Sequence, residues 1–486
     1  GRFRVMKKRT ALYAALICTM MTGCSLKSPV SETVKEPEST TETERAEIPQ
    51  TPAETTVPST IEEFPHEAEE PTVKPPEQKF EEGCRILLAS DIHYLSRGLT
   101  DFGDGFKYKV EHGDGKVVNY IWEITDAFIE AVKKEDPDLV ILSGDLTLNG
   151  ERDSHLDFAK KLKEIEDAGI PVIVIPGNHD INNTAAAQFT GAQALGTAHI
   201  GPDDFAEIYR DFGYDEAVSR DTASLSYVYQ IDDYNRALML DTCQYEPYNQ
   251  VGGMIREETY DWIENQMEDA WDLGMNVIPV GHHNLLDESE VYVEDCTIEH
   301  SEQLIDQLDS WDVPLFLSGH LHVQHFMRED EDYGIYEIVT SSLATPPCQY
   351  GMLDYGDDGS FQYHTVPLDM EAWAKEQGST DKNLLNFKSY STDFLNRVFY
   401  NQAQDEFERM NQFDSLTKRQ KDQMAKVYAE INAACYAGKA VEIKDKATEK
   451  DGYKLWGENG YPSILSQYLE SIVRDATKDY NSLKVE

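Results

Sequence analysis

Pro171-Val-Ile-Val-Ile-Pro176 runs directly into Gly177-Asn178-His179-Asp180, and this junction decides how the rest of the chain is interpreted. A short apolar run that ends at a glycine is typical of a buried strand. An amide, an imidazole and a carboxylate follow at once, and these groups bind divalent cations or move protons. The stretch therefore predicts a strand with reactive side chains at its carboxyl end.

Four other apolar runs end in the same way. The runs 85–90, 138–143, 275–280 and 314–318 lead into Asp91-Ile-His93, Gly144-Asp145, Gly281-His282 and Gly319-His320-Leu321-His322. Further strands are expected at 225–231, 236–240 and 334–340, with helices at 121–132, 155–165 and 257–271. Strands that alternate with helices indicate an α/β fold, in which ligands gather beyond the carboxyl ends of the strands.

The side chains at these strand ends are suited to metal binding. If the chain stays extended past its strand, Asp91 and His93 share one face, and so do His320 and His322. Imidazole and carboxylate groups together suit Mn, Fe, Zn or Co. A single Asp-x-His or Gly-Asp pair is a weak signal, because one histidine at a strand end is more often structural. Five such signatures in order predict a metal centre.

The five signatures resemble the pattern of the calcineurin-like metallophosphoesterase superfamily over residues 84–368. The resemblance implies a four-layer αββα sandwich with two divalent metal ions. It implies that the first ion is held by Asp91, His93 and His322, the second by Asn178, His282 and His320, and that Asp145 bridges both. It also implies that the ions activate water for attack on phosphorus. His179 would then protonate the leaving oxygen as the catalytic residue, oriented by Asp180 or Asp145.

Other polar residues are weaker candidates. His283 is expected to point away from the centre, His155 to lie on the surface of a helix, and Asp241 to be structural. For His325, lining the cleft and a structural role remain open. The segment 95–118 is long enough to be a lid that shapes specificity, and a plain insertion is the alternative.

The charge of the chain limits its partners. The 486 residues carry a formal net charge of −47, and region 81–370 alone has 58 acidic and 16 basic residues, a net of −42. Binding of nucleic acid needs a basic surface, so nucleic acid is not an expected partner. A single phosphate in a metal-lined cleft is compatible with this charge. Together with the chemistry that the resemblance implies, this leaves a small phosphoester as the expected substrate.

The first 80 residues have the features of an export signal and a tether. Lys7, Lys8 and Arg9 precede an apolar run that ends at Thr22-Gly23-Cys24, which is typical of a signal peptide. Met21-Thr-Gly-Cys24 resembles a bacterial lipoprotein box and implies a signal peptide over 1–24 and an acylated Cys24, with a plain secretory signal as the alternative. Residues 25–80 contain nine prolines and predict a disordered tether. The chain is thus expected at the outer face of the cell membrane.

The C-terminal region 371–486 differs from the region before it. Its charges nearly balance, with 19 acidic and 17 basic residues, and apolar residues recur at helical spacing over 424–435 and 464–473. These patterns predict an all-α accessory domain that follows a catalytic domain at 81–370. Five cysteines lie beyond Cys24 without Cys-x-x-Cys spacing, so free thiols are expected.

Three functions remain open at this point. The leading hypothesis is a phosphodiesterase that acts on cyclic nucleotides or other small phosphodiesters with two metal ions. The alternative is a phosphomonoesterase or nucleotidase with the same metal centre. The third is a non-catalytic surface lipoprotein that keeps metals as structural elements, which would have no need of His179.

Overall fold

Two β-sheets form the centre of the molecule. The computed structural model describes residues 83–486, which belong to one compact unit. The first sheet has the strand order β15 (Ser482–Val485), β14 (Phe361–Pro367), β13 (Gln349–Gly356), β1 (Gly83–Ala89), β2 (Leu139–Leu142), β3 (Val172–Val174). The second has the order β11 (His325–Arg328), β12 (Tyr336–Val339), β10 (Leu315–Ser318), β9 (Asn276–Val280), β8 (Asn235–Met239), β7 (Tyr227–Gln230), β6 (Ser219–Arg220).

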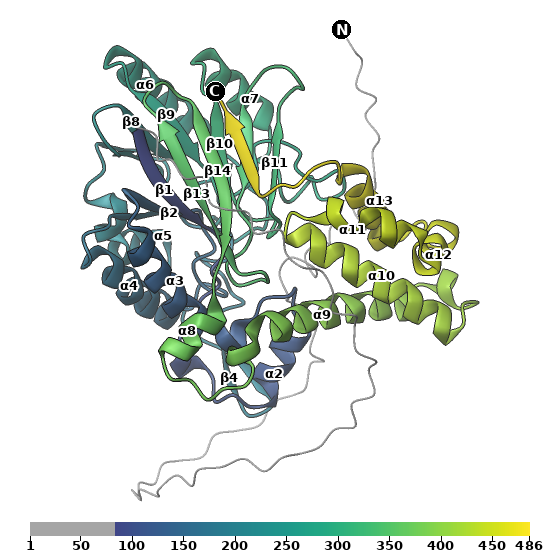
Figure 1. Cartoon of the computed structure of the whole chain (residues 1–486). Coiled ribbons are helices and arrows are strands. Elements are labelled where there is room, and N and C mark those ends of the chain that lie inside the picture. The colour runs from purple at the N-terminus through teal and green to yellow at the C-terminus, as the bar shows by residue number, and fades with distance from the viewer. Residues whose placement is uncertain (1–82) are drawn as a thin grey trace, which may run out of the picture. The chain divides into compact units, whose positions relative to one another are not determined.

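Helices cover the outer faces of both sheets. Helices α3 (Ile121–Glu135) and α4 (Arg152–Glu166) share the main core with the first sheet, and α6 (Glu257–Asp272) and α7 (Ser301–Ser310) cover the second. The second sheet shows strict alternation. Ile278 and Leu317 point into the main core between the sheets, whereas Val277 and Phe316 pack under α6 and α7. The predicted αββα sandwich is therefore confirmed (Figure 1).

The strands that carry the metal-binding signatures are parallel within each sheet. β1 pairs with β2 and β2 with β3, and β8, β9 and β10 are likewise parallel to their neighbours. Carboxyl ends of parallel strands meet at one edge of a sheet, which brings residues distant in sequence together.

The segment between β1 and α3 contains ordered structure where the sequence predicted a long loop. It holds helix α2 (Asp104–Glu111), which packs beside the hairpin of β4 (Ala187–Thr190) and β5 (Gln193–Gly196). Phe106 of α2 lies with its ring centre 5.6 Å from that of Phe189 in β4. Helix α5 (Pro202–Ile208) follows this hairpin.

The chain after the sandwich is largely helical, as predicted. It contains α8 (Met370–Glu376), α9 (Phe387–Arg409), α10 (Lys418–Tyr436), α11 (Ala440–Glu449), α12 (Asp451–Asn459) and α13 (Ile464–Asp475). These helices have a core of their own, in which Trp456 donates a hydrogen bond of 2.8 Å to the carbonyl of Met424. Figure 1 shows α9–α13 gathered on one side of the sandwich. The proposed domain border at residue 370 stays a prediction.

The prediction of an all-α C-terminal region is wrong for its last residues. Ser482–Val485 form β15, which pairs antiparallel with β14 and extends the first sheet (Figure 1). This strand has only four residues, half of them exposed, so no apolar run announces it. Asn481 directly precedes β15, and its side chain accepts a hydrogen bond of 2.6 Å from the hydroxyl of Thr365 in β14. This bond holds the start of β15 beside β14.

Two predictions concern parts of the chain for which no fold can be given. The signal peptide over 1–24 with Cys24 and the tether over 25–80 lie outside the described residues. Within residues 83–486, no helix combines the length and the apolar character that a bilayer span requires.

Candidate metal centre and active site

The two sheets bring six of the seven predicted metal ligands into two overlapping groups. Ligand atoms within 4.8 Å of one another come from Asp91, His93, Asp145 and His322 in one group and from Asp145, His282 and His320 in the other. All six side chains are buried. Asp145 belongs to both groups, which is the arrangement expected of a carboxylate between two cations.

The local backbone differs from the extended form that the sequence analysis assumed. Asp91, His93, Asp145, His320 and His322 have φ angles of 53°, 50°, 51°, 70° and 62°. Non-glycine residues rarely adopt this left-handed conformation, and it concentrates at functional sites. Left-handed turns, and not strand alternation, therefore bring the paired side chains to one side.

Tertiary hydrogen bonds impose these turns. The amide of Asp91 donates to the carbonyl of Gly144 at 3.1 Å, and that of His93 donates to the carbonyl of Asp145 at 3.0 Å. The amide of His320 donates to the Asp91 carboxylate at 3.0 Å. The strand ends thus hold one another in place.

The histidines of the second group present lone pairs to the same point. His282 Nδ1 lies 2.8 Å from the Ser143 carbonyl, and His320 Nε2 lies 2.8 Å from the Asp295 carbonyl. A carbonyl only accepts, so these two nitrogens carry the protons. The remaining nitrogens, His282 Nε2 and His320 Nδ1, face each other at 3.2 Å. In the neutral rings both are lone pairs, and a cation between them removes their repulsion.

Asn178 completes this group. Its side-chain Oδ1 lies 3.0 Å from His282 Nε2, and its backbone carbonyl accepts a hydrogen bond of 2.7 Å from the side chain of Asn249. Asp145 Oδ2 lies 3.4 Å from the same His282 nitrogen. An amide oxygen, a carboxylate oxygen and two imidazole nitrogens therefore converge.

The first group also brings imidazole nitrogens and carboxylate oxygens close together. His93 Nε2 lies 3.1 Å from His322 Nε2, and Asp145 Oδ2 lies 3.8 Å from His93 Nε2. Oδ1 of Asp91 lies 3.3 Å from the His322 nitrogen but accepts no well-directed hydrogen bond from residues 83–486. A buried carboxylate oxygen without a hydrogen bond is costly unless a cation meets it. The residues present therefore fit divalent metal ions.

The pKa values show how strongly these groups interact. Burial raises the pKa of Asp145, but His282 and His179 hold it well below its usual value. Burial lowers the pKa of His282, but Asp145 and Asp91 outweigh it and raise the value to about 9. Burial and the neighbouring His282 lower the pKa of His320 to about 3. Without metal a proton on His282 supplies part of the missing positive charge, and a metal ion competes with that proton.

His179 points its free nitrogen at the centre. His179 Nδ1 lies 2.7 Å from the Leu148 carbonyl and therefore carries a proton. The same nitrogen lies 3.1 Å from Asn149 Oδ1. His179 Nε2 lies 3.9 Å from Asp145 Oδ2, on the side of the proposed bridging ligand. The expected orientation of the ring by Asp180 or Asp145 is therefore replaced by orientation through Leu148 and Asn149.

Asp180, predicted to be catalytic, has a different position. Its carboxylate accepts hydrogen bonds from the amides of Leu146, Thr147 and Gly177 at 2.8–3.0 Å and from the Thr147 hydroxyl at 2.9 Å. It thus ties the loop after β2 to the loop after β3. Burial and Asp145 raise the pKa of Asp180 to about 7. Asp180 positions Asp145 and its loop and does not orient the His179 ring.

Comparison with known families agrees with this site. Residues 84–324 match the family model for calcineurin-like phosphoesterases. This region belongs to the calcineurin-like phosphoesterase family. The chain is accordingly a metallophosphoesterase, an enzyme that hydrolyses phosphoric esters with bound metal. Which metals occupy its site is not fixed by the family.

The helical part of the phosphoesterase has a match of its own. Residues 369–479 match the family model described as the C-terminal domain of cyclic nucleotide phosphodiesterase. A curated relative, a probable glycerophosphodiester phosphodiesterase from Arcobacter nitrofigilis, is 25% identical over 303 residues, which are 61% of this chain and 90% of that protein.

Solved structures of phosphatases are also similar to this chain. A dimetal phosphatase from Danio rerio is 14% identical, with a TM-score of 0.41 over 59% of this chain and 96% of that protein. A purple acid phosphatase from yellow lupin (Lupinus luteus) is 15% identical, with a TM-score of 0.39 over 58% and 51%.

Three of the weaker candidates have structural roles in the phosphoesterase. His283 points away from the centre, with Nδ1 2.7 Å from the Thr242 hydroxyl and Nε2 2.7 Å from the Val251 carbonyl. His155 is fully buried, 2.9 Å from the Asp180 carbonyl, so its expected surface position is wrong. His325 does not line the metal centre. It contacts Glu288 and, at 3.0 Å, Asp475 of α13.

Two residues near the centre were not found from the sequence. Asp114 and Lys116 follow α2 in the predicted loop and are both buried. Asp114 Oδ2 lies 3.9 Å from His322 Nδ1 and 3.0 Å from the ammonium of Lys116. The sequence Asp-Gly-Lys gives no sign of a site, because the contact between Asp114 and His322 joins residues more than 200 positions apart.

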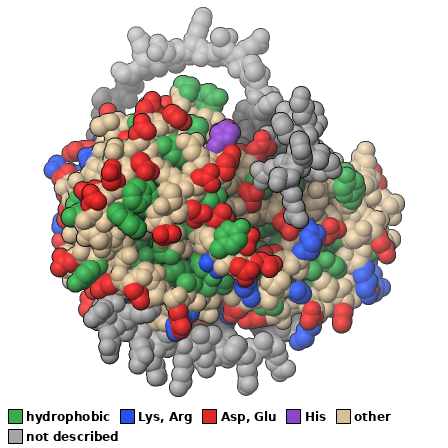
Figure 2. All heavy atoms as spheres, turned by 90° about the horizontal axis from the view of Figure 1, so that it is seen from above, with side chains coloured by type: hydrophobic (Ala, Val, Ile, Leu, Met, Phe, Trp, Pro, Cys, Tyr) green, Lys and Arg blue, Asp and Glu red, His purple; other side chains and the backbone are tan. Residues whose placement is uncertain are grey.

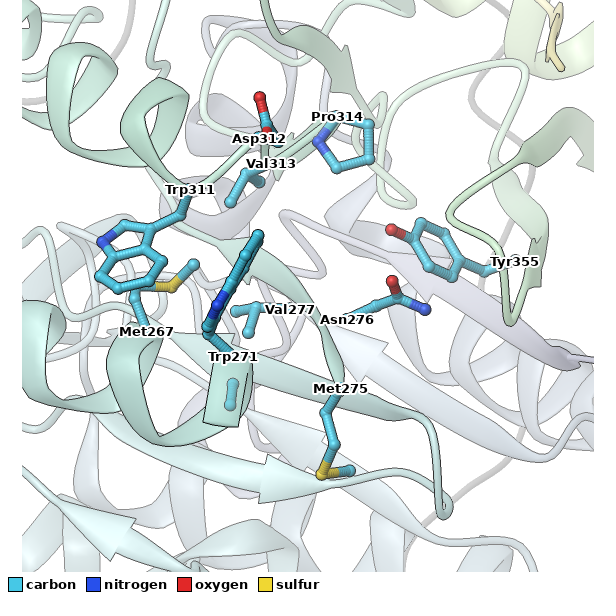
Figure 3. Close-up of a pocket in the computed structure, with 11 residues that line it drawn as sticks. Met267, Trp271, Met275, Asn276, Val277, Trp311, Asp312, Val313, Pro314 and Tyr355 are labelled. Atoms are coloured by element: carbon cyan, nitrogen blue, oxygen red, sulfur yellow. The ribbon is translucent and has the colours of Figure 1, made fainter. Parts of the chain in front are cut away.

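A concavity of the phosphoesterase lies away from the metal centre. It has a volume of about 190 Å³ and is lined mainly by apolar side chains of α6, β9 and the segment before β10, among them Met267, Trp271, Met275, Val277, Trp311 and Pro314 (Figure 3). Asn276, the first residue of β9, also lines it, whereas the ligand His282 follows the other end of that strand. The concavity is therefore separate from the metal centre.

Proposed function

We propose that this metallophosphoesterase hydrolyses small phosphodiesters, with cyclic nucleotides as the first class to test. The metal dependence of this reaction is supported most directly by the facing imidazole nitrogens of His282 and His320, 3.2 Å apart, whose other nitrogens both contact carbonyls. Such an arrangement is preorganised for a cation and costs free energy without one.

The proposed residue roles follow from the geometry. Asp91, His93 and His322 would hold one divalent cation, Asn178, His282 and His320 the other, and Asp145 would contact both. Bound cations of this kind neutralise charge on phosphate oxygens and lower the pKa of water. The chain itself contributes rigid placement, since carbonyls hold the rings of His282 and His320 and tertiary bonds hold the amides of His93 and His320.

His179 is the proposed proton donor to the leaving oxygen. Leu148 holds the proton on Nδ1, so Nε2 is the nitrogen that exchanges a proton with substrate. Burial lowers the pKa of His179, although Asp145 acts in the opposite direction. A bound phosphate anion favours the protonated imidazole, so substrate and proton are expected to bind together.

Three observations support the preference for a diester. The match of residues 369–479 to a cyclic nucleotide phosphodiesterase domain and the phosphodiesterase relative favour it. The charge of the catalytic region, −42 over 81–370, also favours a diester with one negative charge over a monoester with two. Figure 2 shows acidic side chains spread widely over one face of the molecule.

The test is a substrate screen on the metal-reconstituted protein. Rates with bis-p-nitrophenyl phosphate and p-nitrophenyl phosphate are compared first, followed by cyclic nucleotides, with Asp145→Asn as the inactive control. Preference for the diester supports the proposal. Faster turnover of the monoester would establish the phosphomonoesterase alternative. No turnover with two metals bound would favour the non-catalytic lipoprotein.

The cellular location rests on the sequence alone. We infer that Cys24 carries a lipid and anchors the enzyme to the outer face of the cell membrane. The support is the basic and apolar pattern before Cys24 and the proline-rich stretch after it. A membrane-associated phosphodiesterase would meet small substrates outside the cell, without nucleic acid as a partner.

A further inference from the structure

We propose that Lys116 is a substrate-binding residue whose ammonium group contacts a non-bridging oxygen of the phosphate at the metal centre. The proposal rests on the proposed function of the same site. Lys116 belongs neither to the five sequence signatures nor to the proposed metal ligands.

Lys116 lies against the metal centre from the side of His322. Its side chain is 8% exposed, and its ammonium lies 3.0 Å from Oδ2 of Asp114. The same Asp114 oxygen lies 3.9 Å from His322 Nδ1, while His322 Nε2 faces His93 at 3.1 Å. The Asp114 carboxylate therefore lies between the Lys116 ammonium and His322, a proposed metal ligand.

The fold fixes the loop that carries Lys116. Gly115 has a φ of 96°, and a side chain there would lie 2.5 Å from Leu395 of α9, so the turn is pressed against the helical region. The amide of Val117 donates to the carbonyl of Ala344 at 2.8 Å. Two residues before Ala344, the Ser342 hydroxyl donates to the Asp91 carbonyl at 2.8 Å. The position of Lys116 is therefore tied to Asp91 itself.

An anionic substrate explains why a lysine is placed here. Burying an ammonium group is unfavourable, and Asp114 is its one carboxylate partner within 4 Å among residues 83–486. An ammonium has three donors, and its 3.0 Å contact with Asp114 is an ion pair in which Oδ2 accepts no well-directed hydrogen bond. Donors therefore remain for phosphate oxygens, and charge-assisted bonds of this kind are strong. In a region of net charge −42, a local cation also offsets repulsion of the substrate.

The alternative is that Lys116 only neutralises the buried carboxylate of Asp114. The two roles differ in what happens when both charges are removed together. If neutralisation is the whole role, Asp114→Asn should rescue Lys116→Met, because no buried charge is then left unpaired. If Lys116 binds phosphate, the double variant should remain as weak as Lys116→Met alone.

The experiment measures binding of inorganic phosphate to the metal-loaded full chain by isothermal titration calorimetry. The variants are Lys116→Met, Lys116→Gln, Lys116→Arg and Asp114→Asn with and without Lys116→Met, each with its metal content determined. Loss of one charge-assisted hydrogen bond predicts roughly 10- to 100-fold weaker phosphate binding in the Met and Gln variants. Lys116→Arg should retain most of the affinity.

The result also separates this proposal from the proposed function. Wild-type phosphate affinity in the Met variant, rescue by Asp114→Asn, or loss of metals in both neutral variants would overturn it. For bis-p-nitrophenyl phosphate, KM should rise more than kcat falls. If the wild-type enzyme hydrolyses no diester, the phosphate titration still decides the role of Lys116, and only the substrate assignment fails.

Discussion

Replacing Gly177 by alanine should destroy the metal centre through a single added methyl group. Gly177 joins β3 to the Asn178-His179 segment and lies directly behind Asp145. A Cβ atom at this position would lie 2.1 Å from the Asp145 backbone nitrogen and 2.2 Å from its Oδ1. Neither atom can move aside freely, because Asp145 Oδ1 accepts a hydrogen bond of 2.8 Å from the His179 amide.

The size of the effect follows from these distances. Carbon atoms in ordinary contact are about 3.5–4.0 Å from a neighbouring heavy atom, so Gly177 and Asp145 must separate by about 1 Å or more. A displacement of about 1 Å at a catalytic group costs on the order of 10²-fold in rate. Overpacking in a tight interior costs about 1–3 kcal/mol of stability. We expect Gly177→Ala to lose at least about 10²-fold in kcat and to bind metal more weakly.

The assay combines metal analysis of the purified protein with kcat on bis-p-nitrophenyl phosphate. Two glycines provide controls. Gly196 is exposed and a Cβ there meets nothing within 4 Å, so Gly196→Ala should behave as wild type. Gly83, at the end of β1 that lies away from Asp91, would place a Cβ 2.2 Å from the Tyr355 carbonyl. Gly83→Ala should therefore destabilise the protein while leaving metal content near normal.

Comparing these variants separates the effect of displacing Asp145 from the effect of steric strain in general. If Gly177→Ala retains wild-type metal content and turnover, Asp145 does not need its observed position, and the bridging role is refuted. If Gly83→Ala loses metal to the same extent, the effect of Gly177→Ala reflects general destabilisation and not the local geometry.

Three further predictions concern other parts of the chain. His179→Asn should keep both metals and lose roughly 10²–10⁴-fold in rate. The loss should be smaller for a substrate whose leaving group is p-nitrophenolate than for a nucleotide ribose ester, whose alkoxide needs a proton to leave. Equal losses on both substrates would indicate that His179 positions the phosphate. Burial lowers the pKa of His325, but Glu288 and Asp475 raise it to about 10, above that of an unfolded histidine. This contribution to stability is therefore complete below about pH 6.5 and is lost as the pH rises towards 10, by at most about 1.4 kcal/mol per pH unit. Urea unfolding from pH 6 to 10 should show a flatter dependence for His325→Gln, and an unchanged slope would contradict the assignment. Cys24→Ala should leave turnover unchanged and release the enzyme from membranes, which fractionation at low and high salt would show.

The strand ends were predictable because their signals are local. Each apolar run stops at a glycine or a reactive side chain, and parallel strands place their carboxyl ends together. Asp91, His282 and their partners could therefore be assigned to one site from order and spacing. The same reasoning went wrong on backbone shape, because left-handed turns at non-glycine residues arise from tertiary hydrogen bonds. The bond from the His320 amide to Asp91 joins residues 229 positions apart.

Residues whose roles depend on distant partners escaped the sequence analysis. His155 has the spacing of an exposed helical residue, yet Tyr209 and the Asp180 carbonyl bury it. Lys116 lies in a segment without periodicity. Its neighbours come from chain segments near 322, 344 and 395, and no local pattern records such contacts. The short strand β15 was missed for the same reason, since within residues 83–486 it pairs with β14 alone, more than 100 positions earlier in the chain.

The helical region packs against the loop that carries the proposed ligands His320 and His322. Between the ligands His320 and His322, Leu321 turns the other way and packs in a cluster that Tyr436 and Tyr468 also contact. Two residues further on, the amide of Gln324 donates to the Tyr436 carbonyl at 3.1 Å. Both histidines sit in the left-handed conformation, which costs roughly 1–3 kcal/mol per residue and persists only where surrounding contacts enforce it. For this loop, α10 and α13 supply such contacts, because Tyr436 ends α10 and Tyr468 lies in α13. Packing of the helical region and the aim of two metal ligands are therefore coupled through one leucine.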